Sequence, residues 1–278
     1  MSQKETTTRF NFLRRFWKIV KTLFLAYAVV FSLVVTALII SAYIFISRPI
    51  REVRELKVNN PTETAFMAQH SERLSHNPAS SIDQEFVPIT QISPWLKKAV
   101  LAAEDDGFFT HPGFDLDAII AAFDYNRTQG ENIRGASTIT QQLAKNLFLS
   151  PERSFRRKAI ELGYTLLLEH YLSKDRILEL YLNYAQWGVA IFGCEAASWY
   201  YFNKPSYELT LYEAARMAAV LSMPSRLTPH HITSPYMQSR LTVIANNLYY
   251  RGSIDKEQYM MLTENEPPEI VEQNTGVE

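Results

Sequence analysis

The longest apolar segment of the chain lies near its N-terminus. Residues 22–47 contain no Asp, Glu, Lys or Arg and are dominated by Val, Ile, Leu, Phe and Ala. A helix rises about 1.5 Å per residue, so about 20 apolar residues cross the roughly 30 Å hydrocarbon core of a bilayer. The segment is longer than the apolar region of about 7–15 residues in a cleaved signal peptide, and no clean A-x-A site follows it. The pattern therefore predicts one transmembrane helix over 22–47.

After this segment, the apolar positions recur mostly with the period of amphipathic helices, and alternating strand patterns are scarce. Ser93 followed by Pro94 is a helix start signal, and Ser150 followed by Pro151 repeats it. The predicted helices run from Pro94 to about Asp105, from Pro151 to about Leu172, from the cap at Ser173 onward, and over 209–221. The body of the chain should be a mainly α domain, large enough to bury one core.

Breaks and shifts in composition divide the chain into five predicted parts. They are a basic segment (1–21), the transmembrane helix (22–47), a polar and partly helical juxtamembrane connector (48–84), a folded domain (85–252), and a C-terminal segment with an acidic, mobile tail (253–278).

Charge is distributed unevenly, although the net charge is only −1. Residues 1–21 carry six basic side chains and one acidic one, whereas residues 48–278 are net acidic. Basic residues beside a span favour the cytoplasmic side, and a long domain after the span can translocate despite cations such as Arg48. The N-terminus should be cytoplasmic and the domain extracytoplasmic. The near-neutral total gives no basic field for nucleic acid, and the single cysteine, Cys194, excludes an internal disulfide framework.

The first candidate site lies where the first predicted domain helix ends. Glu104, Asp105 and Asp106 precede Gly107, which places their carboxylates at a helix-to-loop junction. The negative end of a helix dipole raises the pKa of a carboxylate and suits it to act as a general base. Composition alone favours solvated surface acids instead. His111 should be structural, and the six histidines show no metal-binding spacing.

The second candidate site is a turn of small residues that enters a helix, residues 135–146. Ser137 is predicted to cap this helix, and its free amides could hold an anion. One face of the helix carries Thr138, Gln141, Gln142 and Lys145. Lys145 lies about 12 Å along the axis from the cap, so the cap and Lys145 should have different roles. An amphipathic helix with a polar surface explains the same spacing.

The third candidate site is a polar row at every fourth position of one long helix, comprising Arg153, Arg157, Glu161, Thr165 and Glu169. Arg157 and Glu161 are spaced as an ion pair, with Lys158 beside them. A solvated face with helix salt bridges worth about 0.2–0.5 kcal/mol each explains the row. The flanking leucines at 162 and 166–168 indicate instead a helix surrounded by protein, in which charges need partners.

Together these segments resemble the peptidoglycan glycosyltransferases, the transglycosylase domain shared by class A penicillin-binding proteins and monofunctional transglycosylases. The resemblance covers about residues 85–250, and the run STITQQLAKN is its most specific part. The blocks that carry it are Glu104-Asp105 with Phe108, His111 and Gly113; Gly135 with 137–146; Arg157-Lys158 with Glu161 and Glu169; 177–183 with Gly188, Gly193 and Ala196-Ala197; and Glu213-Ala214-Ala215 to Pro224.

The resemblance implies a lysozyme-like, two-lobed α fold, with a large head and a smaller membrane-proximal jaw, at the bacterial cytoplasmic membrane. It implies polymerisation of lipid II into β-1,4-linked glycan strands, with release of undecaprenyl pyrophosphate. The growing strand is the donor and a new lipid II is the acceptor. The expected partners are these substrates, the membrane and other cell-wall synthesis proteins, and no nucleic acid.

The resemblance also implies roles for the two carboxylates. Glu104 would be the general base that takes the proton from the 4-hydroxyl of the acceptor. Glu161 would lie at the donor pyrophosphate, directly or through a divalent cation such as Mg²⁺, with no organic cofactor. The cationic pyrophosphate contacts would be Lys145 and Arg153. The other residues expected to bind substrate are Asp105, Phe108, Ser137, Thr138, Gln141, Gln142, Asn146, Arg157 and Lys158.

Three features bear on alternatives to this function. A muramidase would share the fold but needs no pyrophosphate-binding cations, so the basic residues of the second and third segments argue against it. An inactive membrane-tethered scaffold is supported only by Gly107 and by Ile160, where some relatives have Lys. An S-x-x-K at Ser253 has no K-T-G or K-S-G downstream, so a monofunctional enzyme without a transpeptidase domain is expected.

Overall fold

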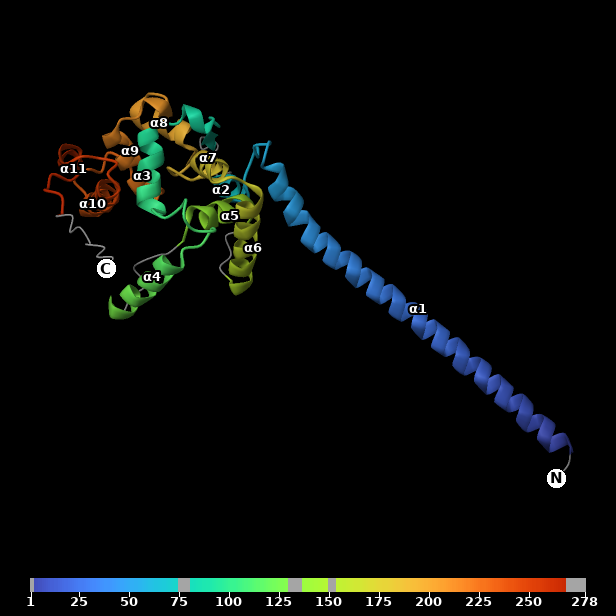
Figure 1. Cartoon of the computed structure of the whole chain (residues 1–278). Coiled ribbons are helices and arrows are strands. Elements are labelled where there is room, and N and C mark those ends of the chain that lie inside the picture. Colours follow the sequence, from blue (N-terminus) through green and yellow to red (C-terminus); the bar gives the residue numbers. More distant parts are fainter. Residues whose placement is uncertain (1–2, 75–80, 130–136, 150–153, 269–278) are drawn as a thin grey trace. The chain divides into compact units, whose positions relative to one another are not determined.

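The computed structural model describes residues 3–74, 81–129, 137–149 and 154–268 of the chain (Figure 1). It divides into two compact units, Met1–Glu52 and Val53–Glu278. The first unit is part of a single helix, α1 (Gln3–Glu55), which contains the predicted span 22–47 and continues beyond it in both directions. Residues Arg14–Glu55 of this helix are long and apolar enough to cross a membrane.

The second unit is mainly helical, as predicted. Its helices are α2 (Ala65–Leu74), α3 (Pro94–Glu104), α4 (Leu116–Gln129), α5 (Ile139–Phe148), α6 (Phe155–Tyr171), α7 (Lys174–Tyr184), α8 (Cys194–Phe202), α9 (Leu211–Val220), α10 (Pro235–Tyr250) and α11 (Lys256–Thr263). Short 3₁₀ helices occupy Ile89–Gln91 and Ser206–Glu208. Two parallel two-residue strands, β1 (Asp83–Gln84) and β2 (Ile191–Phe192), pair Asp83 with Ile191.

Helix α3 carries the first candidate site at its C-terminal end and is anchored in the core. It packs on α9 and α10, and Leu96, Ala99 and Val100 on its inner face are fully buried. Helix α5 forms a second layer against α6, α7 and α2. Because tightly packed helices hold their termini in fixed positions, the end of α3 and the face of α5 are rigid platforms for side chains.

Several predicted helix starts are confirmed. Ser93 caps α3, with Oγ accepting from the amide of Trp95 (3.2 Å), and α3 ends at Glu104. Ser173 caps α7 through the amide of Arg176.

One predicted cap is wrong, because helix α5 is capped by Thr138 rather than Ser137. Helix α6 begins at Phe155, where the hydroxyl of Ser154 accepts from the amide of Arg157 (3.1 Å). The predicted start at Ser150 and Pro151 lies outside the described residues. The connector predicted over 48–84 is also partly integrated into the fold, since Val53, Leu56 and Met67 belong to the core.

Asn183 on α7 joins the chain before α3 to the core. It is fully buried, its Oδ1 accepts from the amide of Val87 (2.8 Å), and its Nδ2 donates to the carbonyls of Val87 (2.9 Å) and Glu179 (2.8 Å). An unsatisfied buried polar group costs about 1–3 kcal/mol. Asn183 thus fixes the position of the segment that leads into α3.

We expect Asn183→Ala to lower the free energy of unfolding by about 2–3 kcal/mol, because it leaves both backbone groups of Val87 without these partners. Chemical unfolding of the full chain in detergent measures the loss. The exposed Asn59 provides the control, since Arg176 bonds to its backbone oxygen, which Asn59→Ala retains. An equal loss in both variants would contradict the assignment.

Candidate active site

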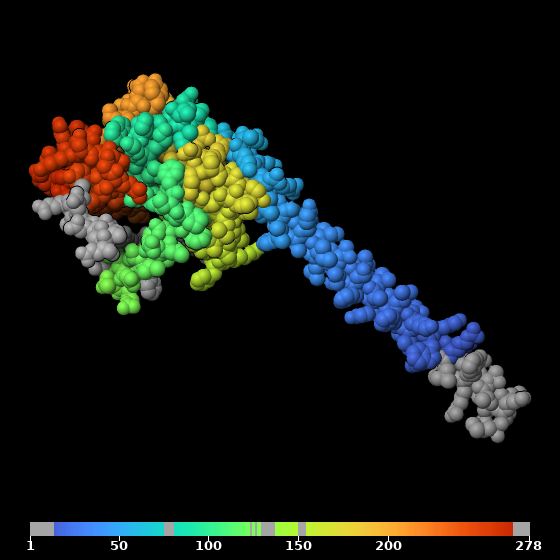
Figure 2. Space-filling view, in the orientation of Figure 1, coloured from blue at the N-terminus to red at the C-terminus, as the bar shows by residue number. Residues whose placement is uncertain are grey.

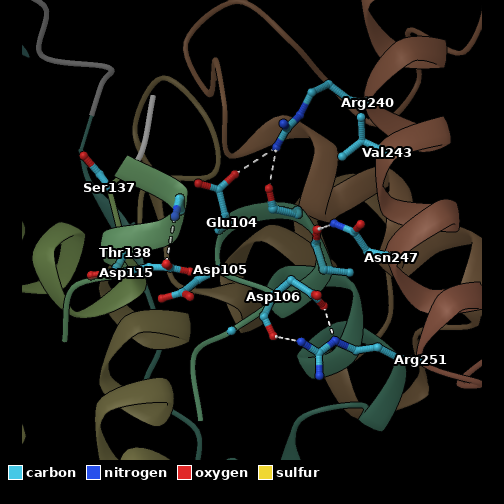
Figure 3. Close-up of a pocket in the computed structure, with 14 residues that line it drawn as sticks. Glu104, Asp105, Asp106, Asp115, Ser137, Thr138, Arg240, Val243, Asn247 and Arg251 are labelled. Atoms are coloured by element: carbon cyan, nitrogen blue, oxygen red, sulfur yellow. Dashed lines mark hydrogen bonds and ion pairs between the residues drawn. The ribbon is translucent and has the colours of Figure 1, made fainter. Parts of the chain in front are cut away.

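Glu104 is the last residue of α3, and side chains of α5 and α10 hold its carboxylate; Figure 3 shows the contact from α10. Arg240 on α10 donates through Nη2 to Oε1 of Glu104 (3.0 Å) and to the carbonyl of Ala103 (3.0 Å). Gln142 on α5 donates through Nε2 to Oε2 of Glu104 (2.9 Å). The side chain of Glu104 is only 12% exposed. Each carboxylate oxygen therefore has one donor, and the two donors come from different helices.

Burial raises the pKa of Glu104 above its ordinary value and is the largest influence on it. The hydrogen bond from Gln142 and the charges of Arg240 and Lys145 lower the pKa, and the neighbouring Asp105 raises it. The predicted direction is confirmed, but desolvation rather than the helix dipole is its main cause. A carboxylate in this state binds a proton more readily than a solvated one.

A pocket of about 520 Å³ opens in front of Glu104 (Figure 3). Its walls come from the end of α3 and the loop after it, from α4, from the start of α5 and from α10. The polar groups in the walls include Asp106, Asp115, Asn247 and Arg251. Glu104 is thus sheltered from bulk water but remains reachable by a ligand that enters this pocket.

Asp105 has a different task from its neighbour. Its side chain is 3% exposed, its Oδ2 accepts from the amide of Ile139 (2.9 Å), and its Oδ1 bonds to Nε2 of His111 (2.8 Å). Nδ1 of His111 accepts from the amide of Gly113, so Nε2 carries the proton toward Asp105. The anion predicted at the start of α5 is therefore Asp105 itself, and His111 is structural, as predicted.

The side chains of Thr138 and Gln141, at the start of α5, form hydrogen bonds with backbone groups. Oγ1 of Thr138 accepts from the amide of Gln141 (3.2 Å) and donates to the carbonyl of Gly113 (2.6 Å). Oε1 of Gln141 accepts from the amide of Thr138 (3.2 Å), which completes a capping box. Both residues are buried in this arrangement, whereas Ser137 is exposed; Ser137 and Thr138 both line the pocket.

Two further residues that were expected to bind substrate lie inside the protein. Phe108 is fully buried, and Nζ of Lys174 lies 4.4 Å from the centre of its ring. Asn146 is also buried. A side chain enclosed in this way packs the protein and does not present itself to a ligand in this conformation.

A second charged cluster forms between α5 and α6. Glu161 on α6 is buried, and Lys158 donates to its Oε1. The predicted partner, Arg157, does not form the ion pair that the structure describes for Glu161, and its Nε is buried without a hydrogen-bond partner among the described residues. Arg153 lies outside the described residues.

Lys145 connects this cluster to Glu104. Burial lowers the pKa of Lys145, the charges of Glu161 and Glu104 raise it, and those of Arg157 and Lys158 lower it. A side chain that interacts electrostatically with both carboxylates lies within range of both. The structure therefore brings together the first, second and third candidate segments, which spacing alone left separate.

Helix α6 presents its polar row to the protein interior. Glu161 and Thr165 are buried, whereas Leu162 and Leu166 are 42% and 48% exposed. The prediction that the leucines enclose this helix in protein is therefore wrong for these two positions. The polar row faces inward because α6 packs on α5, which carries Lys145 and Thr140; Oγ1 of Thr140 donates to Glu169.

Helix α10 supplies site residues that the sequence did not indicate. Arg240 pairs with Glu104, and Arg251, just after the helix, pairs with Asp106 (Figure 3). Asn247 donates to the carbonyl of Ala102 (2.8 Å). These residues lie more than 130 positions from their partners and form no local motif. In the sequence, the feature that could have indicated a site here was a basic residue, Arg240, within an otherwise amphipathic helical segment.

Comparison with known proteins gives consistent matches. A family model described as transglycosylase matches residues 70–249. A protein of Paraburkholderia xenovorans named biosynthetic peptidoglycan transglycosylase is 44% identical over 190 residues, which cover 68% of this chain and 79% of that protein. One of the same name from Ralstonia nicotianae is 45% identical over 197 residues, covering 69% and 84%. A crystal structure of penicillin-binding protein 1A from Haemophilus influenzae covers 68% of this chain and 18% of its own, with 20% identity and a TM-score of 0.36.

We expect Asp105→Ala to lower the free energy of unfolding by about 3 kcal/mol, because it removes a buried acceptor from the amide of Ile139 and from His111. Thermal unfolding of the full chain in detergent measures the effect. The matched control is Asp106→Ala, which removes a half-exposed ion pair with Arg251 and should cost at most about 1 kcal/mol. If both variants lose equal stability, Asp105 is not the anchor of α5.

Proposed function

The chain belongs to the transglycosylase family, and from that premise we propose that it polymerises lipid II into β-1,4-linked glycan strands with inversion at the anomeric carbon. One observation carries the proposal. Glu104 is a sheltered carboxylate with a raised pKa at an open pocket, and Lys145 couples it to the charged cluster around Glu161. A base and a cationic region within electrostatic range of each other are what transfer from a pyrophosphate requires.

In the proposed reaction, Glu104 is the general base. The 4-hydroxyl oxygen of the acceptor lipid II attacks the anomeric carbon of the growing strand, and its proton passes to Glu104. The bond from that carbon to the pyrophosphate breaks, and the electron pair leaves with undecaprenyl pyrophosphate. Displacement from the opposite face converts the α-linkage into a β-linkage. Arg240 and Gln142 support this role, because they hold the carboxylate still while burial keeps it basic.

The charged cluster on α5 and α6 is placed in our proposal at the leaving group. The departing pyrophosphate gains negative charge, which Lys145, Arg157 and Lys158 would stabilise. The Nε of Arg157 supports this role, since it is buried without a hydrogen-bond partner among the described residues and can donate to an anionic oxygen. Glu161 would keep these cations together while no substrate is bound, as its pairing with Lys158 suggests.

The described residues give no support for a resident divalent cation held by the protein alone. Among them, no group of three or more His, Cys, Asp or Glu side chains could hold a metal ion. The carboxylate of Glu161 is nearly enclosed and is paired with Lys158. A site for Mg²⁺ needs carboxylates with space for several water or phosphate oxygens. We therefore route no step of the reaction through a metal ion.

The second unit exposes apolar side chains that suit contact with a membrane. Helices α4 and α6 project from the same side of this unit in the view of Figure 2. Their exposed apolar side chains are Leu116, Ile119, Ile120, Phe155, Leu162 and Leu166. Such side chains suit an interface with lipid, where a lipid-linked substrate resides. We propose that α1 anchors the chain in the bacterial inner membrane, with the N-terminus cytoplasmic and the catalytic unit outside.

We expect Glu104→Gln to reduce polymerisation of purified lipid II by at least 100-fold without unfolding the protein, because an amide cannot accept the proton. Gel analysis of the glycan product measures it, and thermal unfolding checks the fold. The matched control is Glu257→Gln on the exposed surface of α11, which should retain wild-type activity. Full activity of Glu104→Gln would contradict the proposal. Shortening of added glycan strands by the wild type would indicate a muramidase instead.

We expect kcat/KM to fall on the acid side with a midpoint above the ordinary pKa of a glutamate. The base acts only when ionised, and burial raises the pKa of Glu104, so protonation removes activity at a higher pH than for a solvated carboxylate. Because the charge of Arg240 lowers this pKa, Arg240→Gln should move the acid limb to still higher pH. A limb that stays in place in Arg240→Gln would show that another group controls it.

A further inference from the structure

A chain of hydrogen bonds leads from Glu104 into the core. Gln142 donates to Oε2 of Glu104 through Nε2 (2.9 Å), and the hydroxyl of Tyr181 donates to Oε1 of the same glutamine (3.0 Å). The three residues come from α3, α5 and α7. Helix α5 packs on α7, and its first amide bonds to Asp105, which directly follows α3. Tyr181 is 1% exposed, so it does not face the pocket.

The direction of each bond in this chain is fixed. Glu104 as a carboxylate only accepts, so the amide nitrogen of Gln142 must face it and the amide oxygen must face Tyr181. Burial, together with the charges of Glu104 and Asp105, raises the pKa of Tyr181 well above its ordinary value, so this hydroxyl keeps its proton and remains a donor. The tyrosine thus supplies the partner that the amide oxygen requires in this orientation.

The other charged groups around Glu104 cannot replace this chain. Among the described residues, Arg240 on α10 bonds to Oε1, Asp105 just after α3 repels the carboxylate, and Lys145 on α5 acts on it by charge without a direct bond. The position of Oε2 therefore depends on Gln142. Without the donor for its amide oxygen, the half-buried Gln142 side chain would lose this hydrogen bond or turn away from Glu104.

We propose that Tyr181 is a positioning residue for glycosyl transfer: by bonding to Gln142, it holds that amide against Glu104 and so fixes the carboxylate in its reactive orientation. The inference rests on the proposed role of Glu104 as the base. Tyr181 contacts no substrate, and its effect reaches the reaction only through Gln142.

The test compares two tyrosines on the same helix in the full chain, with purified lipid II as substrate. Tyr181→Phe should lower kcat about fivefold to tenfold with little change in KM, because the loss of one hydrogen bond of about 1 kcal/mol loosens the base. Its acid limb should move to higher pH, since the Gln142 bond lowers the pKa of Glu104. The control is Tyr184→Phe, which removes a buried hydroxyl that donates to the carbonyl of Pro61 (2.6 Å).

A double-mutant cycle separates positioning from packing. If Tyr181 acts through Gln142, Tyr181→Phe should cause no further loss of kcat in a Gln142→Met background. Equal effects of Tyr181→Phe and Tyr184→Phe, a change in KM alone, or a full additional loss in the Gln142→Met background would each overturn the proposal.

A direct titration distinguishes this outcome from failure of the proposed function. The pKa of the Glu104 carboxyl, followed by ¹³C NMR of labelled protein, should rise in Tyr181→Phe and not in Tyr184→Phe, whether or not the protein polymerises lipid II. An unchanged pKa overturns the positioning role. Wild-type activity in Glu104→Gln, by contrast, would overturn the proposed function and leave the titration result standing on its own.

Discussion

The burial of a carboxylate at the end of α3 is the constraint on which the site depends. A buried Glu104 needs donors, and among the described residues they come from α5 and α10. The adjacent Asp105 secures one of them, because it accepts from the first amide of α5. The two neighbouring acids therefore have different roles: Asp105 fixes the position of α5, and α5 supplies the donor to Glu104. Once α5 is fixed, Gln142 and Lys145 follow at set positions on its face.

The same constraint explains why α6 turns its polar side inward. Lys145 on the face of α5 is largely enclosed, and Glu161 lies within range to balance its charge. The buried polar row on α6 therefore faces the charged side chain on α5, and Leu162 and Leu166 lie on the exposed side of α6. In water this arrangement would expose apolar area at a cost. Against lipid the cost disappears, so the outward leucines agree with a membrane-facing surface.

The sequence predicted the helical class, most helix starts and the segments that meet at the site, because these depend on local periodicity, caps and short motifs. It placed the cap of α5 at Ser137 rather than Thr138, because two hydroxyl residues follow each other there and only the folded chain decides between them. It read the amides of α5 as a ligand site, although Asp105 fills it from 34 positions away. The roles of Arg240 and Tyr181 at Glu104 were not predicted, although Tyr181 lies in the block 177–183: each residue acts on its partner across the fold, and neither belongs to a local pattern of charge.

The choice of donors around Glu104 follows from the task of a base. A second cation at Oε2 would hold the carboxylate as firmly as an amide but would lower its pKa further, and a weaker base accepts a proton less readily. An amide orients the oxygen without adding a net charge, but an amide has two chemically different ends that are similar in shape. It therefore needs a partner that recognises its oxygen. A buried tyrosine meets this need, since its hydroxyl stays protonated and carries no charge. Gln142 thus orients the carboxylate of Glu104 while burial still keeps its pKa above the ordinary value.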